Sequence, residues 1–169
     1  MRTLAIMRHA KSSWDDPALE DHERPLAPRG RDAAPRVDRH LAGRGLRPEV
    51  VLCSSARRTT ETLALLEATT TGAQAHVEDA LYHASAATLL ERVRALPDHV
   101  TSALLIGHNP ACQGLVLELA GRGRRLAEAR AKLPTAAVAL LTLPGDWAEA
   151  GPGNATLDDL VLPRELSSP

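Results

Sequence analysis

The sequence contains no phenylalanine, and its aromatic residues are limited to Trp14, Tyr82 and Trp147. A protein that stacks successive nucleic-acid bases on aromatic side chains is therefore not expected. Cysteine is also scarce: Cys53 and Cys112 are too few and too far apart in the sequence for a disulfide framework or a zinc ligand set. Both lie in apolar stretches, which favours buried structural thiols over redox groups.

Long apolar runs and an excess of one charge are missing as well. No segment approaches the roughly 20 apolar residues that a membrane-spanning helix needs, and Arg8, His9 and Lys11 interrupt the apolar N-terminus before it could serve as a secretory signal. The 20 Lys and Arg residues balance 21 Asp and Glu residues, which leaves a net charge of −1. This balance gives no general electrostatic reason for binding nucleic acid or an anionic membrane. We therefore expect a cytoplasmic protein with neither partner.

The chain has 169 residues, 44% of them hydrophobic, which is the size and composition of one globular domain. Short apolar runs predict strands, and apolar residues at helical spacing predict helices between them. Strands are predicted at residues 1–7, 50–53, 76–78, 102–106, 136–143 and 157–162, and helices at residues 28–42, 60–68, 84–96 and 111–120. The alternation favours an α/β fold, a three-layer α/β/α sandwich around a mostly parallel sheet. We expect a single domain over residues 1–169, with residues 163–169 as a loose tail.

Three of the apolar runs end in unusual polar clusters. Arg8 and His9 follow the first run, residues 54–58 read Ser-Ser-Ala-Arg-Arg after the second, and residues 107–109 read Gly-His-Asn after the fourth. Open α/β sheets bind ligands at the carboxyl ends of their strands. The three clusters are therefore expected to meet in one crevice, which would hold two imidazoles and at least two guanidiniums.

Such a crevice suits a phosphoryl group. Guanidinium groups match phosphate oxygens in a bidentate way and keep their charge at any working pH. An imidazole that stays neutral among cations can act as a nucleophile at phosphorus, and the cations should lower its pKa below about 6.5. The sequence has no dense carboxylate set that would hold magnesium. These residues predict phosphoryl transfer through a phosphohistidine, with no metal and no cofactor.

The residues Arg8-His9-Ala10 resemble the Arg-His-Gly signature of the histidine phosphatase superfamily, with alanine in place of the glycine. Residues 7–14, Met-Arg-His-Ala-Lys-Ser-Ser-Trp, resemble the SixA-like branch, which comprises phosphohistidine phosphatases. The resemblance extends over most of the chain, through residues 21–26, Gly30 and residues 54–62, 81–82, 107–110 and 134–136. It implies a phosphoglycerate mutase-like fold.

The resemblance also implies roles for individual residues. His9 would be the nucleophile that becomes phosphorylated, Arg8 would bind the phosphoryl oxygens, and His108 would be the second catalytic histidine, which stabilises the transferring group. The family's second arginine lies four residues before a threonine. Thr62 is that threonine here, so Arg58 is the matching arginine, and its neighbour Arg57 is expected to face solvent.

Two further matches leave alternatives open. Arg24 resembles an additional phosphate-binding arginine of this branch, although it could equally be a surface ion-pair partner of Asp21 or Glu23.

Larger members of the superfamily carry a carboxylate general acid in an inserted segment, for which this chain is too short. Glu78 and Asp79 lie in roughly the right stretch, but they match that segment poorly.

The missing acid bears on the substrate. The P–N bond of phosphohistidine breaks with less help than a P–O bond, because protonated imidazole leaves readily. The expected substrate is therefore phosphohistidine on a signalling protein, such as a histidine-phosphotransfer domain. Two alternatives remain: a phosphatase of small phosphoesters, and a catalytically weak module that binds phosphoproteins.

Several residues have simpler interpretations. Trp14 could form a wall of the pocket, but a cover over the sheet edge is favoured, and Tyr82 and Trp147 are interpreted as packing residues. Asn109 and Pro110 have the sequence of a helix N-cap and first helical residue. The basic, glycine-containing run at residues 122–125 is interpreted as a solvated loop.

Overall fold

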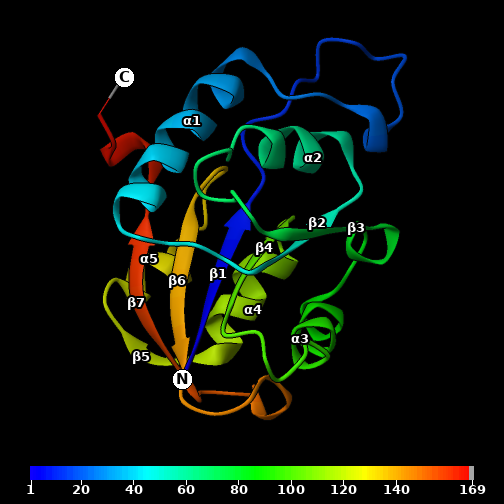
Figure 1. Cartoon of the computed structure of the whole chain (residues 1–169). Coiled ribbons are helices and arrows are strands. Elements are labelled where there is room, and N and C mark those ends of the chain that lie inside the picture. The colour runs from blue at the N-terminus through cyan, green and yellow to red at the C-terminus, as the bar shows by residue number, and fades with distance from the viewer. Residues whose placement is uncertain (168–169) are drawn as a thin grey trace.

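The computed structural model describes residues 1–167 and contains one seven-stranded sheet (Figure 1). The strands are β1 (Arg2–Arg8), β2 (Val50–Ser54), β3 (Gln74–Glu78), β4 (Ser102–Gly107), β5 (Ala120–Gly123), β6 (Val138–Leu143) and β7 (Ala155–Val161), in the spatial order β3-β2-β4-β1-β6-β7-β5. β6 runs antiparallel to β1 and β7, and the other pairs are parallel. The predicted mostly parallel sheet is confirmed.

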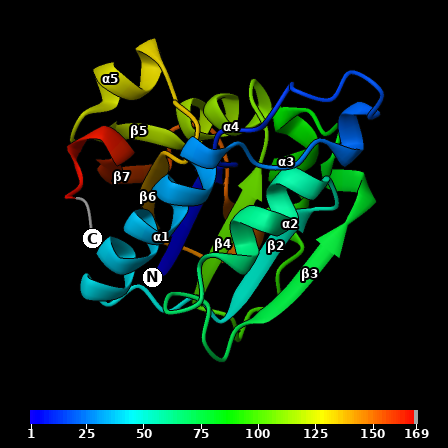
Figure 2. The same ribbon diagram turned by 90° about the horizontal axis from the view of Figure 1, so that it is seen from above.

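Helices cover both faces of this sheet (Figure 2). The helices α1 (Pro28–Gly43) and α2 (Arg57–Ala64) lie on one face, and α3 (Ala86–Arg94), α4 (Ala111–Leu119) and α5 (Leu126–Ala131) lie on the other. The connections hold four short 3-10 helices, η1 (Asp21–Glu23), η2 (Asp79–Leu81), η3 (Trp147–Glu149) and η4 (Pro163–Glu165). The three layers predicted from the alternation of strands and helices are therefore present.

Strand β1 occupies the middle of the sheet and is buried on both faces. Leu4 and Ile6 pack in the core under α3 and α4, whereas Ala5 and Met7 pack in the core under α1. A continuous apolar run suits this position because neither face of the strand meets water. Arg8 and His9, at the end of this run, therefore lie at the centre of the sheet edge that the carboxyl ends of the parallel strands form.

The C-terminal third contains two elements that the sequence analysis missed. These are strand β5 and helix α5. A solvated loop was expected at residues 122–125, but residues 122 and 123 belong to β5, and residues 124 and 125 connect β5 to α5. A Cβ atom on Gly121 would lie 2.2 Å from the carbonyl oxygen of Gly153. The glycines of β5 therefore permit close approach of two backbone segments, although glycine normally indicates a turn.

The expectation of a loose tail is wrong for residues 163–166. They form η4 and the turn after it, where Leu166 N donates to the carbonyl oxygen of Pro163. Glu165 forms an ion pair with Arg125 at 2.7 Å, so the segment is tied to α5. Residues 168–169 of the expected tail lie outside the described part of the chain.

Other boundaries shift by a few residues. The helix predicted at residues 60–68 begins earlier, at Arg57, and ends at Ala64. The N-cap of α4 is Pro110 and not Asn109, although the Asn109 Oδ1 accepts a hydrogen bond from Gln113 N. Both cysteines and Trp147 are buried, as predicted. Within residues 1–167, no helix has the length and apolar character needed to cross a membrane.

Helix α1 packs directly on the loop that follows His9. Ala27 N donates to the carbonyl oxygen of Lys11, and a Cβ atom on Gly30 would lie 2.2 Å from that same oxygen. Only glycine allows the first turn of α1 to approach this backbone so closely. The loop beside His9 is thereby held against a rigid element.

Gly30→Ala is expected to lower the free energy of unfolding by about 1–3 kcal/mol, the usual cost of overpacking a rigid site. The matched control is Gly43→Ala in the same helix, where an added Cβ meets nothing within 4 Å. That change should leave stability unchanged or raise it by up to about 1 kcal/mol. Urea unfolding of both variants measures the difference, and equal stabilities would contradict the close packing.

Candidate active site

The three polar clusters converge, as expected, at the carboxyl ends of β1, β2 and β4. Arg8 ends β1 and His9 follows it, Ser54 ends β2, and His108 follows the last residue of β4. The ring centroids of the two histidines lie 5.3 Å apart. Both histidines line a cavity of about 230 Å³, and Arg8, Arg24, Arg58 and Trp14 are also among its lining residues.

The ring of His9 is oriented by a hydrogen bond from one of its two nitrogens. Its Nδ1 lies 2.7 Å from the carbonyl oxygen of Ala10, and since a carbonyl can only accept, Nδ1 carries the proton. Nε2 of the neutral ring therefore keeps its lone pair. Burial, reinforced by the charges of Arg58 and Arg8, lowers the pKa of His9 to about 4. The imidazole is thus unprotonated at Nε2 at neutral pH, the state in which it can act as a nucleophile.

His108 is oriented by two neighbours. Its Nδ1 lies 3.3 Å from Nη2 of Arg58, which can only donate, and its Nε2 lies 2.8 Å from the Ser54 hydroxyl oxygen. The neutral ring therefore accepts at Nδ1 and donates from Nε2 to Ser54. Burial and the nearby Arg58 and His9 lower the pKa of His108 to about 3.

Of the two adjacent arginines, Arg58 faces the cavity and Arg57 does not. Arg58 is only 6% exposed, and its guanidinium donates to the backbone oxygen and the carboxylate of Asp21 at 2.8 and 3.0 Å. Arg57 pairs on the surface with Glu61. Thr62 links α2 to the loop after β1, because its hydroxyl donates to the carbonyl oxygen of Arg58 and accepts from Ala10 N.

Arg24 combines an ion pair with a place in the lining of the cavity. Its Nε pairs with the Asp21 carboxylate at 3.0 Å, yet the side chain is 6% exposed and lines the cavity. Nη1 also donates to the Ser12 hydroxyl at 2.9 Å. The third cation, Arg8, donates from Nη1 to the carbonyl oxygen of Leu133 at 3.2 Å. Within residues 1–167, the buried Nε atoms of Arg8 and Arg58 have no hydrogen-bond partner in the protein.

Asp21 and Tyr82 are site residues that the sequence reasoning did not identify. The Asp21 carboxylate accepts from the Tyr82 hydroxyl at 2.5 Å and from Arg24 and Arg58. The hydrogen bond from Tyr82 and the two arginines hold the pKa of Asp21 well below its usual range. The ring of Tyr82 packs edge-on against His108 at 5.6 Å, so it does not belong to the apolar core. The sequence signals were the spacing of Asp21 three residues before Arg24 and the family resemblance over residues 21–26 and 81–82, neither of which assigned a role to Asp21 or Tyr82.

The carboxylates considered as general acids lie outside this cavity. Glu78 ends β3, and Asp79 begins η2. The Glu78 carboxylate accepts two hydrogen bonds from Arg92, at 2.8 and 2.9 Å, and this partner lowers its pKa. Glu78 is therefore held in its ionised form, which cannot donate a proton.

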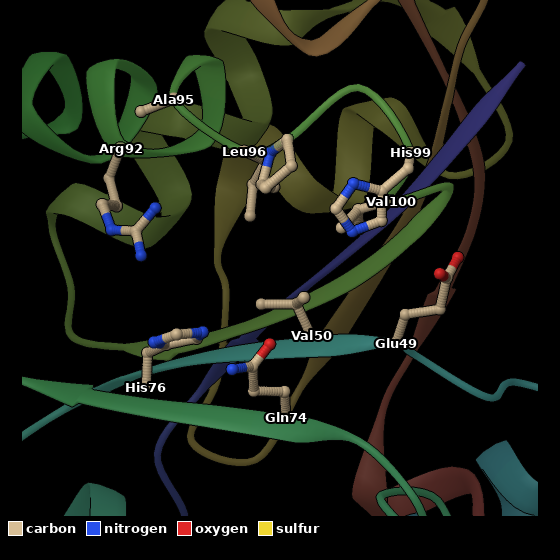
Figure 3. Close-up of a pocket in the computed structure, with 10 residues that line it drawn as sticks. Glu49, Val50, Gln74, His76, Arg92, Ala95, Leu96, His99 and Val100 are labelled. Atoms are coloured by element: carbon tan, nitrogen blue, oxygen red, sulfur yellow. The ribbon is translucent and has the colours of Figure 1, made fainter.

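A larger cavity, of about 460 Å³, lies where β2 and β3 begin (Figure 3). Val50 and Gln74, the first residues of these strands, line it together with Leu96. Arg92 in its wall is already paired with Glu78. The convergent histidines and arginines are therefore in the smaller cavity, and the chemistry belongs to the carboxyl edge.

Within residues 1–167, no group of three or more His, Cys, Asp or Glu side chains has an arrangement that could hold a metal ion. The charge available to an anionic substrate comes from Arg8, Arg24 and Arg58. These guanidiniums can bind oxygen atoms of a phosphoryl group directly.

Comparison with known proteins identifies the class. The histidine phosphatase superfamily (branch 1) matches residues 4–86 of the chain. The uncharacterized protein Rv1276c of Mycobacterium tuberculosis is 40% identical over 168 residues, covering 94% of this chain and 100% of that protein. A Nakamurella multipartitia protein assigned as the phosphohistidine phosphatase SixA is 32% identical, with a TM-score of 0.84 and 96% of each chain covered. The tungstate complex of the protein histidine phosphatase SixA is 28% identical, with a TM-score of 0.78 over 96% of this chain and 97% of that one.

The chain belongs to the histidine phosphatase superfamily. Within that superfamily it falls in the SixA-like branch, and its fold is phosphoglycerate mutase-like. The resemblance carried by residues 7–14 is therefore confirmed at the level of the family.

The two adjacent arginines provide a test of the site. Arg58→Ala should lower the phosphatase rate by about 10²–10³, the effect of removing one donor to a developing charge. Arg57→Ala, a surface change of identical chemistry, should be close to neutral. Steady-state rates on an aryl phosphate compare the two, and a larger loss for Arg57→Ala would mean that the wrong arginine has been assigned to the phosphoryl group.

Proposed function

We propose that this protein is a phosphohistidine phosphatase, which hydrolyses the P–N bond of a phosphorylated protein through a covalent phospho-His9 intermediate. The observation that carries the proposal is the protonation state of two carboxylates, Asp21 beside the cavity and Glu78 outside it. Asp21 is held ionised by Tyr82, Arg24 and Arg58, and Glu78 is held ionised by Arg92. Neither can serve as the general acid that an alkoxide leaving group requires.

The first step is in-line attack of His9 Nε2 on phosphorus. The bond from Nε2 to phosphorus forms while the bond to the substrate nitrogen breaks, and the departing imidazole leaves with a proton taken from solvent. Imidazole has a pKa of about 6.5, so solvent can supply this proton without a dedicated acid. Arg8, Arg24 and Arg58 bind the phosphoryl oxygens, where charge develops in the transition state.

The second step is attack of water on phospho-His9. A bond from the water oxygen to phosphorus forms, the bond to His9 Nε2 breaks, and inorganic phosphate leaves with the protons of the water. His108 donates from Nε2 to Ser54 and accepts from Arg58 at Nδ1. It therefore acts on the transferring group by orienting the Arg58 guanidinium toward the phosphoryl oxygens. Neither step draws on a metal or a cofactor, because the arginines supply the positive charge.

The size of the cavity supports a protein substrate. Its volume of about 230 Å³ is below the roughly 300–1,000 Å³ of typical small-molecule pockets. The site has room for a phosphoryl group and little of the molecule that carries it. This supports phosphohistidine on a protein, such as a histidine-phosphotransfer domain, over a small phosphoester that would need its own binding pocket. The likeness to SixA structures agrees with this choice. The cytoplasmic location remains a prediction from the sequence.

The test compares kcat/KM for phosphohistidine, an aryl phosphate and an alkyl phosphate at one pH. The expected order is phosphohistidine, then the aryl ester, then the alkyl ester. Because a positioned acid contributes about 10²–10⁴-fold, the gap between the first and the last should be at least about 10². The rates should be unchanged in EDTA.

Two controls separate the alternatives. His9→Ala should abolish turnover and leave the thermal unfolding temperature unchanged. A module that only binds phosphoproteins would show no turnover in the unmodified protein either. Equal or better rates on the alkyl ester would contradict the proposal and favour a small-molecule phosphatase. In that event, the variants Glu78→Gln and Asp79→Asn would show which carboxylate provides the proton.

A further inference from the structure

Trp14 is exposed beside the catalytic cavity. The sequence analysis favoured a cover over the sheet edge, and this expectation is wrong: the indole lines the cavity with His9 and is 71% exposed. Large aromatic side chains usually bury most of their surface, because exposure forgoes the free energy of burial. An exposed indole at the mouth of a small polar cavity therefore suggests a contact with the substrate.

One face of the indole is already covered. The Arg24 guanidinium carbon lies 3.5 Å from the centroid of the Trp14 ring, a cation–π contact. Arg24 is itself fixed by Asp21, by the Ser12 hydroxyl and by the Ser13 carbonyl oxygen at 3.1 Å. The guanidinium thus supports the indole from one side, and an exposure of 71% leaves the opposite face open to solvent.

We propose that the open face of Trp14 stacks on the ring of the leaving group, and that Trp14 thereby selects substrates whose phosphoryl group is attached to a planar ring. The inference rests on the proposed function and narrows its substrate class. A phosphoryl group bound by Arg8, Arg24 and Arg58 places the atom that carries it next to the cavity mouth, where Trp14 lies. The imidazole of phosphohistidine is planar and meets the geometry of aromatic stacking.

Stacking of two aromatic rings typically changes an equilibrium about two- to tenfold. Trp14→Ala should therefore raise KM and lower kcat/KM for phosphoimidazole by about three- to tenfold. Phosphoramidate carries the same P–N bond without a ring, so its kcat/KM should fall much less. Trp14→Tyr, which keeps an aromatic ring, should recover most of the loss on phosphoimidazole.

The matched control is Val77→Ala, since Val77 is an exposed hydrophobic residue (52%) on β3 that does not line the cavity. Its kcat/KM should be unchanged on both substrates. An equal loss on phosphoimidazole and phosphoramidate in Trp14→Ala would overturn the inference, because Trp14 would then act only by supporting Arg24. No loss on either substrate would overturn it too.

The same measurements separate this inference from the proposed function. The phosphohistidine phosphatase assignment, and with it the role of Trp14, is contradicted if the unmodified protein is inactive on both P–N substrates and also on a protein that carries phosphohistidine. An unmodified protein active on both, with Trp14→Ala failing to distinguish them, contradicts only the role of Trp14. A loss confined to a phosphorylated protein would assign Trp14 to docking of the protein surface and would likewise overturn stacking on the leaving group.

Discussion

The carboxylate of Asp21 is the contact on which the site depends. It binds Arg24 from the loop after β1, Arg58 from the first turn of α2, and Tyr82 from the end of η2. Two guanidiniums beside buried histidines would repel one another without an anion between them. Asp21 therefore holds together segments that are 37 and 61 residues away from it in sequence, and it orients their donors around one cavity.

The same charges determine the protonation states on which the chemistry depends. Burial and the neighbouring arginines lower the pKa of His9 to about 4 and that of His108 to about 3, so both rings are neutral at neutral pH. The hydrogen bond from Tyr82, together with the arginines that add to the lowering of the His9 pKa, keeps Asp21 ionised. One arrangement thus leaves the His9 ring able to attack phosphorus and leaves Asp21 unable to donate a proton. That combination suits a leaving group that solvent can protonate.

The sequence predicted the elements that neighbouring residues mark. It missed those that depend on contacts between residues far apart in the sequence. The ends of β1, β2 and β4 were evident because an apolar run stops at a polar cluster. Arg58 was distinguished from Arg57 by its spacing to Thr62. The structure supplies the reason, since the Thr62 hydroxyl donates to the carbonyl oxygen of Arg58 and accepts from Ala10 N in the loop after β1. β5 was missed because its glycines serve a close approach to Gly153 and not a turn. Trp14 was misplaced because its partner, Arg24, is identified only by the folded loop.

The most direct measurement is to trap the intermediate. The protein is mixed briefly with a substrate carrying a radiolabelled phosphoryl group, denatured in alkali and digested, and the labelled peptide is identified. The account predicts one labelled peptide, which contains His9, with a label that is stable in alkali and lost in mild acid, as expected for a P–N bond. His9→Ala should give no label. Continued turnover with no labelled peptide, or with the label on another residue, would contradict the account.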